Sequence, residues 1–255
     1  MILDALNIAW LHPGLLLILG AWILPLCKGL TKRVMMVAIP AAAVVICLSM
    51  TADTTFGEVS FLGLDVVFGR VDQLSLVFSY VFSIMALLGM IYALHLKDDS
   101  QHVTALTYAG GALGVTFAGD FISLYIFWEL MAISSALLVW QSREPAAGRA
   151  GFRYLLVHIV GGLILLAGIV LYGFESGSFV FTTEKLGSFE YTAGWWLILI
   201  AFLINAAVPP LGAWLPDAYP EASVTGAVFM TAFTTKSAIY VLIRGFPGTE
   251  LLVWL

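Results

Sequence analysis

The sequence predicts an all-α polytopic membrane protein with about eight transmembrane helices. Of its 255 residues, 61% are hydrophobic and only 11% are charged, whereas a soluble domain is about 45–50% apolar and about 25% charged. A chain this apolar has too few polar side chains to coat itself against water, and no alternation typical of β-strands is evident. Apolar runs close to the length of about 20 residues that a spanning helix needs cover residues 10–28, 34–51, 71–95, 103–119, 121–140, 152–174, 194–211 and 222–244.

The composition also argues against several other classes of protein. A net charge of −5 gives no reason to expect nucleic-acid binding. Cys27 and Cys47 lie in apolar runs without a CxxC spacing, which favours small core residues over metal ligands. The sequence has no cysteine cluster, haem-like histidine pair or phosphate-binding loop. We therefore expect no metal, no cofactor and no enzymatic activity in this chain, so that any redox chemistry belongs to partner subunits.

The apolar runs fall into two parts of the chain. Residues 1–101 hold the first three predicted helices, and residues 102–255 hold the last five. The first run lacks a cleavage site typical of signal peptides, so we expect a retained helix. Only Gly119 and Asp120 separate the fourth run from the fifth, which predicts a tight turn. Asp120 can also cap the fifth helix, because an acid is favoured at the positive end of a helix dipole.

The distribution of lysine and arginine predicts the orientation in the membrane. In an eight-helix topology, loops 28–33, 96–102 and 141–153 share one side and carry seven basic residues, whereas the other side carries Arg70, Lys185 and Arg244. The more basic side is expected to be cytoplasmic. This places the N-terminus outside a bacterial or archaeal cell membrane.

Two charged residues lie deep inside predicted spans. Glu129 is in FISLYIFWELMAISSALLVW, and Lys236 is in VTGAVFMTAFTTKSAIYVLIR. A charge at the centre of a spanning helix costs about 2.5–3.5 kcal/mol on insertion scales, so it must face a bundle interior, a partner or water. Ion or proton handling is the favoured interpretation, since desolvated carboxyl and amine groups can load and release protons near neutral pH. The alternative is that both residues only fix helix packing.

Other polar side chains lie near these charges or in neighbouring spans. Ser134 and Thr235 offer hydroxyl groups to water or to helix backbone, although ordinary helix packing is an equal alternative. His158, in YLLVHIVGGLILL, is a candidate proton relay because imidazole titrates near pH 6.5. The alternative for His158 is a packing group that is bonded to a neighbour.

The seventh run contains a break. In WWLILIAFLINAAVPPLGAWLPDAYPEA, Asn205 lies one turn before Pro209 and Pro210, which cannot sustain a regular helix. A broken helix exposes backbone polar groups, which a membrane tolerates only inside protein or beside water. Transporters use such breaks at ion sites near the membrane midplane, and a purely structural kink is the alternative.

These motifs together resemble the antiporter-like subunits of respiratory complex I, membrane-bound hydrogenases and Mrp-type cation/proton antiporters. The resemblance runs in order over about residues 65–250, and residues 153–162 are most like the D-type subunit of Mrp antiporters. The segments that carry it are RVDQLSLVF (70–78), AGDFISLYIFWELMAISS (118–135), RYLLVHIVGG (153–162), AAVPPLGAWLPDAYPEA (206–222) and TKSAIYVLIR (235–244).

The resemblance implies a role for each matching residue. Glu129 matches the fifth-helix glutamate, which is thought to pair with a lysine of the seventh helix. Lys236 matches the eighth-helix lysine on a central hydrophilic axis. Opening and closing the glutamate–lysine pair would then drive protons along that axis, because an opposite charge favours the charged form of its neighbour.

The chain departs from the family pattern in two ways. Asn205 occupies the position of the seventh-helix lysine, so Lys236 or a bound cation replaces the missing partner of Glu129, or this half no longer pumps. The family also has two inverted five-helix repeats, and this chain contains one of them. We expect either a split gene whose partner chain supplies the second repeat, or a piece of a longer polypeptide.

Three functions are compatible with these features. The favoured one is a subunit of a multi-subunit Na+/H+ antiporter that works with other membrane subunits, protons, possible Na+ and the lipid bilayer. The second is a structural membrane subunit that has lost its own pumping, which Asn205 motivates. The third is the membrane arm of a complex I-like respiratory, hydrogenase or carbon-uptake complex.

Overall fold

The structure is a computed structural model that describes residues 11–61, 64–182 and 186–253. Each of the eight predicted apolar runs coincides with a helix. Position 10, where the first run was expected to begin, and Lys185 lie outside the described residues. The helices are α2 (Pro13–Ile23), α3 (Gly29–Ser49), α4 (Gln73–Tyr92), α5 (Asp99–Phe117), α6 (Phe121–Trp140), α7 (Pro145–Ser176), α9 (Ala193–Asn205), α10 (Trp214–Ala218), α11 (Val224–Gly245) and α12 (Glu250–Val253), with short 3-10 turns at Leu24–Leu26, Ala93–His95 and Leu211–Ala213.

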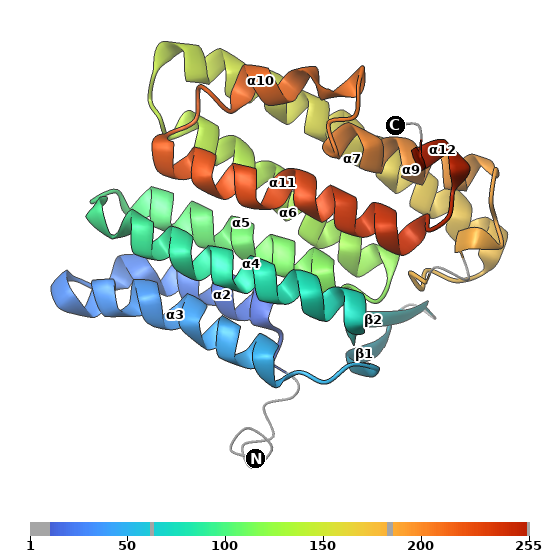
Figure 1. Ribbon diagram of the computed structural model, residues 1–255, viewed down its shortest axis with the longest axis horizontal. Helices are drawn as coiled ribbons and strands as arrows, with labels where there is room; N and C mark the ends of the chain where they lie inside the picture. The colour runs from blue at the N-terminus through green and yellow to red at the C-terminus, as the bar shows by residue number, and fades with distance from the viewer. Residues whose placement is uncertain (1–10, 62–63, 183–185, 254–255) are drawn as a thin grey trace.

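The long helices form a bundle in which they run side by side (Figure 1). Among the described residues, five helices are long and apolar enough to cross a membrane: α3, α4 with its 3-10 extension, α6, α7 and α11. The apolar helices Pro13–Leu26 and α9 are shorter. The chain is thus a mostly helical membrane protein, as its composition predicted.

Helix α5 is the central element of the bundle, because it packs against α2, α4, α6 and α11. Its residues from Thr104 to Phe117 are buried without exception. Glycine makes the closest of these contacts possible: a Cβ atom on Gly110 would lie 2.7 Å from the backbone oxygen of Gly14 on α2. Burial by neighbouring helices explains how α5 can be the least apolar of the long helices and still lie inside the bundle.

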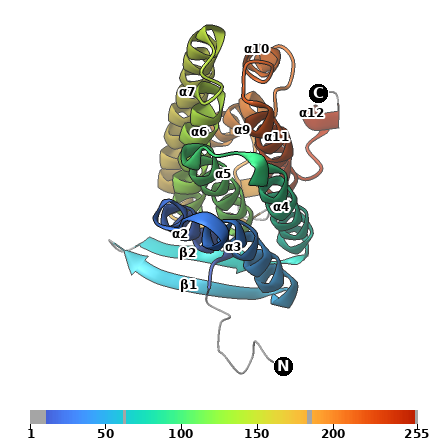
Figure 2. The ribbon, with the colours of Figure 1, turned by 90° about the vertical axis from the view of Figure 1, so that its left-hand side faces the viewer.

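The prediction of an all-α chain is wrong in one segment. Residues between the second and third predicted helices form an antiparallel hairpin of β1 (Thr54–Phe61) and β2 (Leu64–Val71), in which Thr54 pairs with Val71 and Phe56 with Gly69. The hairpin lies across one end of the bundle, below α2 and α3 in Figure 2. The segment is rich in threonine, valine and phenylalanine, which favour strands, although its turn residues and acids give it a polar average.

The predicted tight turn between the fourth and fifth helices is confirmed, and it holds the hairpin. The Asp120 side chain caps α6 by accepting hydrogen bonds from the backbone N–H groups of Ile122 and Ser123, both at 2.8 Å. Its other oxygen accepts from the Val67 N–H of β2 at 2.8 Å, and Gly119 N–H donates to Val67 O at 3.0 Å. Asp120 is fully buried, so its role is to join helix, turn and hairpin.

The loops predicted to share the basic side meet in the structure. Lys32 forms an ion pair with Asp99, and Arg143 pairs with Asp98 at 2.6 Å. The N-terminus of α3, the N-terminus of α5 and the loop after α6 are therefore linked by charge.

The opposite end of the bundle has its own charge cluster. Asp72 caps α4 in a capping box with Ser75, and Arg244, at the end of α11, contacts both carboxylate oxygens of Asp72 at 2.7–2.8 Å. This pairing closes α11 against α4 at that end.

Candidate functional site

Helix α9 stops at Asn205, in agreement with the predicted break in the seventh span. The chain leaves the helix through Ala207, which has a positive φ of 59°, and a cis peptide bond between Pro209 and Pro210. The indole N–H of Trp214 on α10 donates to the carbonyl of Ile204 at 2.9 Å. The break therefore has a defined structure, in which a side chain from the returning segment bonds one of the last carbonyls of α9.

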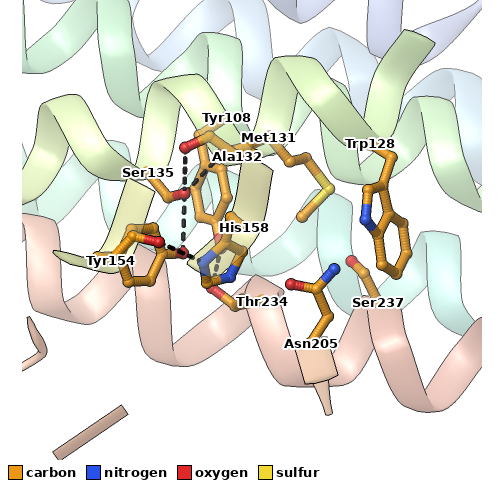
Figure 3. Close-up of a pocket in the computed structure, with 10 residues that line it drawn as sticks. All are labelled: Tyr108, Trp128, Met131, Ala132, Ser135, Tyr154, His158, Asn205, Thr234 and Ser237. Atoms are coloured by element: carbon orange, nitrogen blue, oxygen red, sulfur yellow. Dashed lines mark hydrogen bonds between the residues drawn. The ribbon is translucent and has the colours of Figure 1, made fainter. Parts of the chain in front are cut away.

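A small cavity lies beside the end of α9. Its volume is about 20 Å³, and a volume of roughly 10–15 Å³ is enough to hold one water molecule. Its walls come from five helices, α5, α6, α7, α9 and α11, and many of them are polar (Figure 3). The lining residues are Tyr108, Trp128, Met131, Ala132, Ser135, Tyr154, His158, Asn205, Thr234 and Ser237.

Three lining side chains bring buried polar atoms that have no hydrogen-bond partner among the described residues. They are Nε2 of His158, Oδ1 of Asn205 and Oγ of Ser237, and each residue is at most 4% exposed. Leaving such an atom unsatisfied costs about 1–3 kcal/mol. A cavity with three such atoms is therefore suited to a small polar guest such as water or a proton carrier.

The orientation of His158 follows from its other ring nitrogen. Nδ1 lies 2.9 Å from the backbone oxygen of Tyr154; because a carbonyl only accepts, Nδ1 must donate. A neutral imidazole then carries its acceptor lone pair on Nε2. The ring stacks on Tyr154 at 4.0 Å and meets Trp214 edge to face at 4.7 Å, so aromatic contacts hold this acceptor in place.

Four hydroxyl groups of the lining residues form two hydrogen-bonded pairs, and each pair joins two helices. Tyr154 OH donates to Ser135 Oγ at 2.9 Å, which joins α7 to α6. The hydroxyls of Tyr108 and Thr234 are also hydrogen-bonded to each other, which joins α5 to α11. Hydroxyl groups both donate and accept, so these pairs can take part in proton transfer without carrying a charge.

Glu129 lies beside the cavity but is not part of its lining. It is half-buried on α6, and its Oε1 atom is enclosed without a hydrogen-bond partner among the described residues. The carboxylate lies against Gly162 of α7. The neighbouring residues Trp128 and Met131 do line the cavity. The Glu129 carboxylate therefore lies next to the cavity, on the side toward Gly162 of α7.

Lys236 is on the outer surface of the described chain. It is exposed, and its Nζ atom donates to the backbone oxygen of Thr231 at 2.7 Å. No ion pair joins Lys236 to Glu129 within the described ranges, so the structure gives no support to Lys236 as the replacement partner, which was one of the three alternatives. The helical period explains this placement: Thr234 and Ser237 point into the bundle, and position 236 points away from it.

The remaining predicted residues have structural contacts. Ser134 Oγ bonds the carbonyls of Leu130 and Met131 in its own helix, at 2.5 Å and 3.2 Å, which agrees with the packing alternative. Thr235 is half-buried. Pro209 lies in the break itself. In the part of the chain that the structure describes, no group of three or more His, Cys, Asp or Glu residues is placed to hold a metal ion.

Sequence reasoning missed several members of the cavity, namely Tyr108, Tyr154 and Ser237. One signal was available, because residues three or four apart share a helix face. Tyr154 lies four residues before His158, and Ser237 lies three after Thr234. Tyr108 had no such signal, since its helix contained no candidate that could mark the inner face.

Part of the chain matches a known protein family, and nearly all of it matches a longer relative. Residues 118–253 match the protein family described as "NADH:quinone oxidoreductase/Mrp antiporter, TM". A protein named Na(+)/H(+) antiporter subunit A1 from Staphylococcus aureus is 28% identical over 262 residues, which cover 93% of this chain and 33% of the relative. This chain thus spans about a third of the length of that relative.

Two solved structures share the fold. A chain of respiratory complex I from Thermus thermophilus with bound Aureothin matches with a TM-score of 0.79 and 20% identity, over 95% of this chain and 55% of that one. A chain of the Mrp complex from Dietzia sp. matches with a TM-score of 0.77 and 23% identity, over 91% of this chain and 27% of that one.

Proposed function

The chain belongs to the NADH:quinone oxidoreductase/Mrp antiporter transmembrane family, and we propose that it forms half of a proton-translocating module in a multi-subunit Na+/H+ antiporter. The observation that carries the proposal is the cavity at the end of α9, whose lining includes His158, Asn205 and Ser237, each with a buried polar atom that has no partner among the described residues. Buried polar groups of this kind are expensive in a membrane and mark ion or proton pathways.

In this proposal protons move through groups that stay neutral at rest. His158, a lining residue, accepts a proton at Nε2, the ring nitrogen that has no hydrogen-bond partner among the described residues. Asn205 cannot carry a proton charge, but its amide oxygen can accept a hydrogen bond from a protonated guest. Ser237 supplies a hydroxyl that donates or accepts. The site would thus have no fixed lysine charge. Its polar groups would be uncharged at rest and would carry a charge only while a proton is bound.

Glu129 is the acidic group of the proposed path. Its enclosed oxygen is free of hydrogen bonds within the described part of the chain, so it has room to bind a proton. Lys236 lies on the outer face, where we propose that it meets an acidic or polar group of a partner subunit. A chain that supplies the second five-helix repeat is the natural candidate for that partner.

The placement of the module follows the same reasoning. We propose a multi-pass protein of a bacterial or archaeal cell membrane, with the N-terminus outside and the basic loops in the cytoplasm. The named relative is an A1 subunit, and residues 153–162 resemble the D-type subunit. Both observations support a place among the antiporter-like subunits of such a complex. The partner chains with which it assembles then decide which of those subunits it is.

Transport by the assembled complex tests the proposal. Inside-out membrane vesicles that contain the complex would be energised, and the release of the pH gradient on addition of Na+ would be followed with a fluorescent amine. Glu129→Gln is expected to abolish this release while the subunits still assemble. Ser134→Ala is the matched control, because its hydroxyl bonds only its own helix. Wild-type transport by the Glu129→Gln complex would sink the proposal.

A structural subunit is the second candidate, and two observations favour it. Asn205 stands where the family lysine is expected, and Lys236 bonds the backbone oxygen of Thr231 rather than Glu129. This candidate predicts full transport when Glu129 and Lys236 are both neutralised to glutamine. Mass spectrometry of the complex, isolated mildly from its native membrane, separates both candidates from a respiratory or carbon-uptake arm, which would bring redox subunits with it.

A further inference from the structure

The carboxylate of Glu129 occupies the space where α7 lacks a side chain. A Cβ atom built on Gly162 would lie 2.0 Å from Oε1 of Glu129, 2.9 Å from its Cδ and 3.2 Å from its Oε2. Real Cβ atoms essentially never come closer than 3.0 Å to another group. Any residue larger than glycine at position 162 therefore forces the carboxylate to move by about 1 Å or more.

The preceding glycine has no such function. A Cβ atom on Gly161 would meet only the Cγ2 atom of Ile204, at 3.6 Å, which is an ordinary contact. The two glycines are adjacent in α7, so they share the same helix, the same backbone conformation and the same depth. The space over Gly162 is thus specific to the side chain of Glu129 and is not a general property of this part of the helix.

The position of Gly162 relates Glu129 to the cavity. Gly162 lies four residues after His158 on α7, so both share one helix face, and they are separated by about 6 Å along the axis. The carboxylate therefore rests on α7 at a position about one helical turn along the axis from that of His158. From this geometry we propose that Gly162 is a positioning residue, whose missing side chain places the Glu129 carboxylate beside His158 for proton exchange. This inference rests on the proposed function for the role of Glu129, and on geometry alone for its position.

Two readouts on the complete complex test the position and the role separately. The first is the rate at which a membrane-permeant carbodiimide modifies Glu129, measured by mass spectrometry of the peptide that contains it. The second is Na+-dependent proton release in vesicles. The variants are Gly162→Ala, its matched control Gly161→Ala, and Gly162→Ala combined with Glu129→Asp, whose shorter side chain removes the overlap.

The inference predicts a distinct pattern for each variant. Gly162→Ala should change the modification rate severalfold and lower transport by about 10- to 100-fold, since a misplacement of about 1 Å can cost that much. Gly161→Ala should match the wild type in both. The Gly162→Ala/Glu129→Asp complex should transport faster than Gly162→Ala. Assembly and thermal stability should stay unchanged, because the displaced atom is the free end of a flexible side chain.

The possible failures are distinguishable. An unchanged modification rate in Gly162→Ala, or an equal change in Gly161→Ala, would overturn the positioning role whatever happens to transport. Reduced transport in Gly162→Ala without any recovery by Glu129→Asp would also overturn it, because the defect would then come from helix packing. A changed modification rate in Gly162→Ala, together with wild-type transport by the Glu129→Gln complex, would support the position of the carboxylate and reject the proposed function.

Discussion

Replacing Asp120 by alanine should loosen one end of the bundle. The substitution removes the acceptor for the backbone N–H groups of Ile122 and Ser123 and for the Val67 N–H of the hairpin. Loss of a helix cap costs about 1 kcal/mol, and loss of a buried hydrogen bond to a charged group costs about 1.5–3 kcal/mol. The expected loss is therefore about 3 kcal/mol, or roughly 6–12 °C in Tm for a chain of this size.

Two assays report this loss at different places. Thermal unfolding of the detergent-solubilised complex gives the apparent Tm, and hydrogen exchange gives the protection of the Val67 amide. Asp120→Asn is the matched control: its amide oxygen can still cap α6, whereas its NH2 group cannot accept from Val67. Its Tm should lie between those of Asp120→Ala and the wild type. A Tm for Asp120→Ala within about 2 °C of the wild type, with unchanged exchange at Val67, would refute the assigned role of the aspartate.

Two further predictions concern charges at the surface of the described chain. Arg153 donates to Asp217 at 2.6–2.7 Å, and this hydrogen bond lowers the pKa of Asp217. A lowered folded-state pKa stabilises the folded chain above the ordinary aspartate pKa of about 3.9, and this stabilisation is lost as the pH falls through the folded-state pKa. The Tm difference between wild type and Asp217→Asn should therefore be small but present at neutral pH, and it should disappear in acid. A difference that grows in acid would contradict the pairing. Lys236→Gln should change the free energy of unfolding by less than about 0.5 kcal/mol, because the side chain is exposed, while Na+-dependent proton release falls; a large loss of stability would instead show that Lys236 is a packing residue.

The positions of the helices could be predicted because the bilayer imposes a simple rule. A run of about 20 apolar residues needs no partner to be identified, and the double proline after Asn205 stops a helix wherever it occurs. The same holds for Asp120, whose capping role depends only on residues next to it in the chain. Features of this kind are local, so one sequence contains all the information that they require.

The hairpin and the direction of Lys236 depend on contacts between distant segments. The strands at 54–71 pair with each other, but the hairpin is fixed in place by hydrogen bonds between Val67 and the turn at Gly119 and Asp120, more than 50 positions away. Lys236 was one of three alternatives for the missing partner of Glu129, because Asn205 occupies the position of the family lysine. Which face of α11 points inward is decided by its packing against α4, α5, α6 and α9, and that packing leaves position 236 outside.

The cavity could likewise be predicted only in part from the sequence. His158 and Asn205 were each candidates, but they lie on different helices and nothing in the sequence indicated that they meet. Their proximity follows from the packing of α7 on α9 and from the return of Trp214 beneath both. The members of the site could be named individually, while the site as a geometric object required the fold.

The ion pairs at the basic end have a consequence for how the protein is made. Membrane insertion responds to lysine and arginine while acids contribute little, so Lys32 and Arg143 act as free positive charges when the orientation of the chain is decided. Once the helices have come together, the same two side chains are bound to Asp99 and Asp98. If the predicted orientation holds, residues that orient the chain during biosynthesis later form ion pairs that join its loops. A charge-conserving exchange of Lys32 with Asp99 would keep the ion pair of the finished protein, yet it would change the order in which positive charge is presented to the insertion machinery.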